Sequence, residues 1–180
     1  MTEPHDSTVP ALRIEARNDV AVRASGDFVL YWMIMHRRPG WNFSLQRAVD
    51  WARSLERPLV ILEALRCGYP WASDRLHAFM LDGMAANARS FASTAALHYP
   101  YVETSGDRGK GLLSELAARA CVVVTDEFPC FMVPHMVAAA AKQVACRFEV
   151  VDSKGFLPSR ATRRIFPSAY AFRRFLQCMS

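Results

Sequence analysis

The chain has 180 residues, a length typical of one domain, and 52% of them are hydrophobic, enough for a buried core. No apolar run approaches the roughly 18 residues of a membrane span, and the N-terminus lacks the apolar core of a signal peptide, so we expect a cytoplasmic protein with no membrane partner. The five scattered cysteines lack the paired spacing of zinc ligands, so we predict reduced thiols and no metal site.

The net charge of +5 is concentrated at the C-terminal end of the chain. Six lysines and arginines and no acid follow Asp152, whereas the preceding residues contain 16 bases and 17 acids. Such a basic tail suits the phosphates of a nucleic acid or an acidic partner surface. A solvated arginine-rich helix explains the same composition, and the sequence leaves both interpretations open.

Residues 1–26 are polar and predict a flexible or loosely docked N-terminal extension. After them, apolar segments typical of buried strands alternate with amphipathic segments typical of helices. The predicted strands are 28–35, 58–65, 99–104, 121–127 and 147–153. The predicted helices are 41–56, 74–97 (with Ser73 as its N-cap), 112–120, 133–145 and 168–177. We assign 27–153 to an α/β domain and 154–180 to a basic linker and the start of a helical segment.

This alternation predicts a Rossmann-like, doubly wound, five-stranded parallel sheet with helices on both faces. We expect the strand order 3-2-1-4-5, counted along the chain. Ligands of such sheets bind beyond the carboxyl ends of the strands, where the order reverses. That crevice lies between strands 28–35 and 121–127. The residues that end these two strands are the predicted cofactor-binding residues: Met35, His36, Arg37, Asp126, Glu127 and Phe128.

In this cleft, charged groups would orient the polar ends of a ligand, and aromatic and thioether groups would stack on a flat conjugated ring. The alternative is that Arg37 and its neighbour Arg38 are solvated loop residues. Asn87 lies in an apolar helical stripe, where a buried amide needs partners. We expect a loop rather than a ligand to supply them.

Other motifs fail on spacing. "HRRPGWN" after the first strand does not supply the GxGxxG fingerprint, which argues against NAD or FAD binding in this domain. "GDRGKG" (106–111) is too short for a phosphate-binding P-loop and is expected to be an exposed turn. No serine lies in a nucleophile motif such as GxSxG, so no catalytic residue is predicted.

Four segments in this order resemble DNA photolyases, most nearly the class II and related bacterial branch. They are "VLYWMIMHRRPGWN" (29–42), "DRLHAFMLDGM" (74–84), "VVVTDEFPCFMVPHMV" (122–137) and "EVVDSKGFLPSRATRRIFPSAYAFRRFL" (149–176). The resemblance extends from about residue 27 to the end of the chain.

The resemblance implies the amino-terminal antenna domain of a deoxyribodipyrimidine photolyase-like DNA repair flavoprotein. In that family this domain holds a light-harvesting chromophore such as a deazaflavin or methenyltetrahydrofolate. In that family a helical domain follows, which binds FAD and receives the flipped lesion. Excited FAD then splits the lesion, a lyase reaction. We see no FAD site or lesion pocket in these 180 residues and do not expect them to repair DNA alone. A helical FAD-binding domain, in cis or in trans, is the expected partner.

Two other functions stay open at this point. The first is a stand-alone α/β binding module that docks a partner or nucleic acid weakly through its basic tail. The second is a nucleotide-binding domain akin to universal stress or adenylyl-transferring proteins, against which the missing glycine-rich phosphate loop counts.

Overall fold

The computed structural model describes residue 4 and residues 7–104, 106 and 109–178. Within these residues, six strands form one sheet: β1 (Ile14–Ala16), β2 (Phe28–Met33), β3 (Leu59–Leu65), β4 (Leu97–Val102), β5 (Ala120–Asp126) and β6 (Arg147–Val151). The helices are α1 (Phe43–Leu55), α2 (Asp74–Phe91), α3 (Leu112–Arg119), α4 (Val133–Ala141) and α5 (Ala169–Gln177), with short 3-10 turns at Ala11–Arg13 and Ser159–Ala161.

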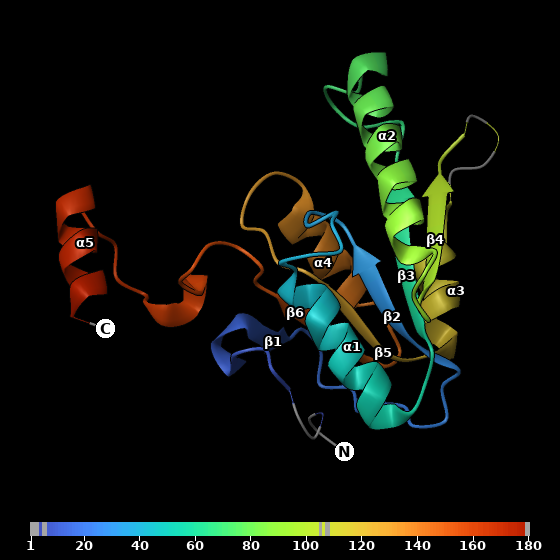
Figure 1. Ribbon diagram of the computed structural model, residues 1–180, viewed down its shortest axis with the longest axis horizontal. Helices are drawn as coiled ribbons and strands as arrows, with labels where there is room; N and C mark the ends of the chain where they lie inside the picture. Colours follow the sequence, from blue (N-terminus) through green and yellow to red (C-terminus); the bar gives the residue numbers. More distant parts are fainter. Residues whose placement is uncertain (1–3, 5–6, 105, 107–108, 179–180) are drawn as a thin grey trace.

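The strand order is β1-β6-β5-β2-β3-β4, and of these described strands only β1 runs antiparallel to its neighbour (Figure 1). The five parallel strands lie in the predicted order. The predicted number of strands is wrong, because the sheet has a sixth strand, β1, beside β6. The missed strand, β1, pairs Ile14 with Val151 and Ala16 with Glu149. Three residues are too few for a periodic pattern, so only their pairing with β6 reveals them.

The strands bury alternate side chains in two cores, one on each face of the sheet. One core contains Val29, Tyr31 and Met33 of β2 with residues of α1 and α2. The other contains Phe28 and Leu30 of β2 with residues of α3 and α4. Helices therefore cover both faces, and the carboxyl ends of the parallel strands meet at one edge.

Two predicted boundaries move in the structure. The predicted helix 74–97 ends at Phe91, where the Thr94 hydroxyl donates to the Phe91 carbonyl, and the predicted third strand begins earlier, at Leu97. β4 is the edge strand and is half-exposed, which blurs its hydrophobic pattern. The predicted N-cap is confirmed, because the Ser73 side chain accepts a hydrogen bond from the Leu76 amide.

A buried charge network ties α1 to β6. The Arg47 guanidinium donates to both carboxylate oxygens of Glu149 on β6, at 2.8 and 3.1 Å, and the Trp51 indole donates to Oε2 at 2.9 Å. The Arg147 Nε also donates to Glu149, at 2.6 Å. Burial alone would raise the pKa of Glu149, but the hydrogen bonds from Arg47 and its neighbours lower it below its ordinary value.

The predicted N-terminal extension packs on the segment that leaves β6. Arg13 is 3% exposed, and its guanidinium donates to the carbonyls of Asp152, Lys154, Gly155 and Phe156. Residues 11–16 of the extension thus contact the α/β domain through Arg13 and β1. At the C-terminal end of the described chain, α5 lies apart from the sheet, after an extended stretch (Figure 1). Among the described helices, none combines the length and apolar character needed to cross a membrane.

Candidate ligand-binding site

The loop after β2 is organised by Asp126, the last residue of β5. β2 and β5 are adjacent and parallel, so their carboxyl ends lie side by side, as predicted. The Asp126 Oδ2 accepts hydrogen bonds from the backbone amides of Ile34, Met35 and His36, at 2.9, 2.7 and 3.0 Å. Oδ1 accepts from the Tyr31 hydroxyl at 2.8 Å. The carboxylate is fully buried and used by the protein itself, so its role is to shape this loop.

Asn42, the N-cap of α1, closes the same loop from its other end. Its Nδ2 donates to the Tyr31 hydroxyl and to the carbonyls of His36 and Arg38. Burial, together with the nearby Asp126 charge, raises the pKa of Tyr31 well above its ordinary value, so the phenol stays protonated and donates. Burial also lowers the pKa of His36, which favours an uncharged imidazole at neutral pH.

Arg37 turns toward β3 rather than toward Asp126. Its Nε donates to the Ile34 carbonyl and its Nη2 to the Ala64 carbonyl, and Nη1 lies 3.6 Å from the Glu63 Oε1. Glu63 is fully buried and also accepts from Asn87. Arg37 is therefore not a solvated loop residue, since it joins the ends of β2 and β3.

The partners of Asn87 are the Glu63 carboxylate, at 3.1 Å, and the Arg37 carbonyl, at 3.2 Å. The expectation that a loop satisfies this amide is confirmed in part, because Arg37 belongs to the loop after β2. The sheet supplies the other partner. His98 of β4 completes the cluster, with its Nε2 2.8 Å from Glu63.

Glu127 and Phe128 lie on the other side of this edge. The Glu127 carboxylate is 2.7 Å from the Arg160 guanidinium, and burial raises its pKa despite that positive charge. Phe128 packs against the core of α3 and α4, and its ring stacks parallel to that of Phe131. The six predicted residues thus divide among three neighbourhoods around the end of the sheet.

A cavity of about 680 Å³ opens at the carboxyl ends of β2, β3 and β4, between α2, α3 and α4. Met35 and Arg37 line it, whereas His36, Asp126, Glu127 and Phe128 do not. Most of its wall is aromatic, aliphatic or thioether. The residues that sequence reasoning missed include Trp32, Tyr69, Met80, Tyr101, Leu112, Phe131, Met132 and Met136.

One signal in the sequence pointed toward Tyr69. This residue follows the end of the predicted strand 58–65, and the carboxyl ends of parallel strands share one edge of the sheet. Trp32 and Met35, from the first parallel strand and the loop after it, also line the cavity. The size and apolar lining are typical of small-molecule sites.

Gly109 is part of the cavity wall and has a φ of +55°. A Cβ at this position would lie 2.6 Å from the Tyr101 ring, so a larger residue would displace that ring. At the mouth lie Arg66 and Lys110, two cations without an ion-pair partner among the residues that the structure describes. The site thus combines an apolar interior with these two cations and one acid, Glu103, which accepts a hydrogen bond from the Cys67 amide.

The N-terminus of α1, where a dinucleotide fold would bind phosphate, is already occupied by side chains. The Ser44 amide donates to the Ser153 hydroxyl, and the Leu45 amide to the Asn42 side chain, both at 3.0 Å. A second cavity of about 750 Å³ lies beside this helix end. The described residues contain no cluster of three or more His, Cys, Asp and Glu side chains that could hold a metal ion.

Comparison with known proteins shows a partial similarity to a DNA repair enzyme. No protein-family model matches the chain. A deoxyribodipyrimidine photo-lyase of Methanothermobacter thermautotrophicus is 33% identical over 76 residues, which are 42% of this chain. The chain resembles a photolyase over part of its length. The match spans 17% of that photolyase, so it supports a photolyase-related domain and does not extend to the activity of the whole enzyme.

The arrangement is suited to binding rather than to bond-breaking chemistry. Of the charged groups that line the cavity, Arg37 is bonded to the backbone carbonyls of Ile34 and Ala64 and lies 3.6 Å from Glu63. The wall offers stacking surfaces and sulfur contacts to a flat ring. The prediction that all six residues contact a cofactor stays a prediction, and the geometry favours Met35 and Arg37 over the other four.

Proposed function

We propose that this chain is the antenna domain of a photolyase-related DNA repair protein and that the 680 Å³ cavity binds its chromophore. The observation that carries the proposal is the position and lining of the cavity. It lies at the carboxyl ends of parallel strands, and aromatic and methionine side chains from β2, α2 and α4 surround it. The partial similarity to a photolyase supports the same class of protein.

The ligand that fits this lining is a flat conjugated molecule such as a deazaflavin or methenyltetrahydrofolate. Trp32, Met35 and Phe131 would contact its rings, while Arg66 and Lys110 would attract an anionic group at the entrance. A bound chromophore of this kind would absorb near-ultraviolet or blue light. FAD binding, lesion binding and the lyase reaction are proposed for a helical domain, in cis or in trans.

Filling the cavity tests this proposal. We expect Ala64→Phe to weaken chromophore binding at least tenfold, because Ala64 lines the cavity and a phenyl group there occupies ligand space. Fluorescence titration of the purified chain with methenyltetrahydrofolate and with a deazaflavin measures the affinity. Val49→Phe, which fills the second cavity beside α1, is the matched control and should leave the affinity unchanged. If the wild-type chain binds neither chromophore, the antenna function is wrong.

The C-terminal segment favours a second function, docking of nucleic acid. Arg163, Arg164, Arg173 and Arg174 are exposed there, and no acid lies among them. We expect weak, non-specific binding of duplex DNA whose affinity falls steeply with salt concentration, because phosphate contacts release counterions. Replacing these four arginines with glutamine should abolish a shift in fluorescence anisotropy at low salt. If DNA binding survives the replacement, another surface of the chain binds the DNA and this second function of the C-terminal segment is wrong.

A further inference from the structure

Helix α2 has an apolar stripe that is left exposed in the part of the chain that the structure describes. The helix is 18 residues long but buries only Met84, Asn87 and Phe91. A second stripe, spaced three and four residues apart, runs along an adjacent side: Leu76, Phe79, Gly83 and Ala86, all exposed. Leu76 is 44% exposed and Phe79 is 77% exposed. This spacing is the pattern by which one helix packs lengthwise on another.

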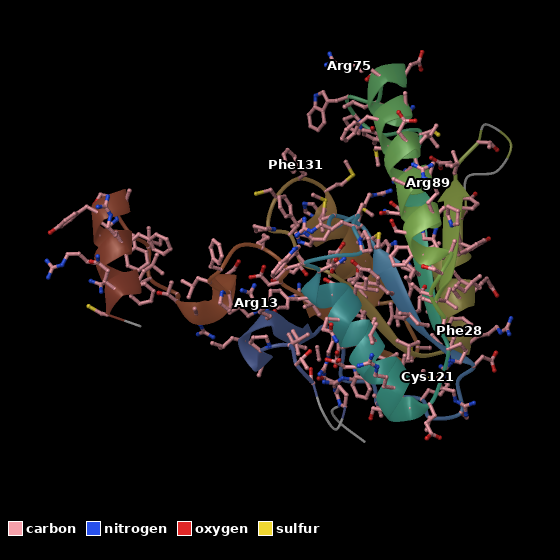
Figure 2. The ribbon with its side chains drawn as sticks, viewed as in Figure 1. Arg13, Phe28, Arg75, Arg89, Cys121 and Phe131 are labelled. Atoms are coloured by element: carbon pink, nitrogen blue, oxygen red, sulfur yellow. The ribbon has the colours of Figure 1, made fainter. Side chains whose placement is uncertain are left out.

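A row of charges flanks this stripe. Arg75, Asp82 and Arg89 recur every seven residues, and Figure 2 shows Arg75 and Arg89 along α2, with Arg75 at its free end. Seven residues of helix span about 10 Å, which is too far for Arg75 and Asp82 to pair with each other. Within the described ranges of the chain, neither of these two residues has an ion-pair partner.

We propose that α2 pairs with α2 of a second copy of this chain, in an antiparallel and symmetric contact. Placing Leu76 opposite Phe79 of the second copy brings the two largest side chains of this stripe together twice. The same register sets Arg75 about two residues, or about 3 Å along the axis, from Asp82 of the second copy. Apolar and charge complementarity therefore select one register, and symmetry repeats both contacts.

Beyond the central pair the stripe continues as Gly83 and Ala86, whose small side chains leave room for close approach of a second helix. The contact is centred between His77 and Ala78, in the half of α2 that projects beyond the sheet in Figure 1. Because the area is limited to one pair of helix ends, we expect a dimer that dissociates on dilution into the low micromolar range.

Charge reversal tests the register. Sedimentation velocity of the full chain over a concentration series should show a monomer–dimer equilibrium. Arg75→Asp alone, or Asp82→Arg alone, should shift the dissociation constant at least fivefold toward monomer, because each variant places like charges opposite each other. The double variant Arg75→Asp with Asp82→Arg should restore the wild-type constant. All of these side chains are exposed, so we expect the variants to fold, and circular dichroism checks this.

Arg89→Asp is the matched control, since Arg89 lies outside the contact in this register and its reversal should leave the equilibrium unchanged. Phe79→Glu should abolish the dimer. A chain that is monomeric at all concentrations overturns the proposal. A dimer that survives both single reversals, or that the double variant fails to restore, also overturns it and assigns the contact to another surface or partner. None of these outcomes depends on chromophore binding.

Discussion

Asp126→Ala is expected to lower the free energy of unfolding by about 4 kcal/mol, the largest effect of any single substitution that we predict. The carboxylate accepts hydrogen bonds from the Tyr31 hydroxyl and from the amides of Ile34, Met35 and His36. Removing the shared acceptor leaves these buried or half-buried donors without a partner. Each such loss costs about 1 kcal/mol or more. Urea denaturation monitored by circular dichroism measures the change.

The same substitution should also weaken chromophore binding, because Met35 lines the cavity and its backbone amide depends on Asp126. The neighbouring Glu127→Gln is the control. Glu127 pairs with Arg160 at a partly exposed position, where such pairs contribute at most about 1 kcal/mol. Equal losses of stability in Asp126→Ala and Glu127→Gln would show that the loop does not depend on the buried carboxylate.

Arg47→Met is expected to cost about 3 kcal/mol at neutral pH. The substitution leaves the Glu149 carboxylate buried with Arg147 and Trp51 as donors, and an incompletely compensated charge is strongly unfavourable in a core. The double variant Arg47→Met with Glu149→Leu should recover much of the loss, since both charges are gone. Denaturation of the wild type, the single variants Arg47→Met and Glu149→Leu, and the double variant forms a double-mutant cycle.

The effect of Arg47→Met should depend on pH in a defined direction. In the wild type the pKa of Glu149 is lowered, so its stabilising contribution is present above the ordinary carboxyl value of 4.5 and is lost as the pH falls through the folded value. Without Arg47, burial favours the protonated acid, so the variant is penalised most at neutral pH. The stability gap should therefore narrow between about pH 7 and about pH 4. A gap that widens on acidification would contradict this account.

The wild type has other carboxylates that contribute in the same direction. The pKa values of Glu15 and Asp152 are also lowered. Burial alone would raise them, but hydrogen bonds from Arg17 to Glu15 and from the Ser159 amide to Asp152 lower them by more. Acid destabilisation of the wild type is thus a sum, and only the difference between wild type and the Arg47 variants isolates Glu149.

Local pattern determined much of the fold. Continuous apolar segments marked β2, β3 and β5 most clearly, and amphipathic segments marked the helices between the strands. The neighbouring position of β2 and β5 was expected from the strand order of a doubly wound sheet, and the structure pairs them. Asn87 was recognised as needing a partner because an amide in an apolar stripe is costly when unsatisfied.

Only the tertiary structure decided how the charged residues are used and where the cavity lies. Arg37 and Asp126 were expected to face one crevice. Instead Arg37 bonds to β3, and Asp126 accepts from backbone amides that are 90 or more residues away in the sequence. The cavity lies over β2, β3 and β4 instead of between β2 and β5. Periodicity shows which side chains are buried, because burial repeats along the chain. It carries no information on which buried polar groups meet, because that depends on segments far apart in sequence.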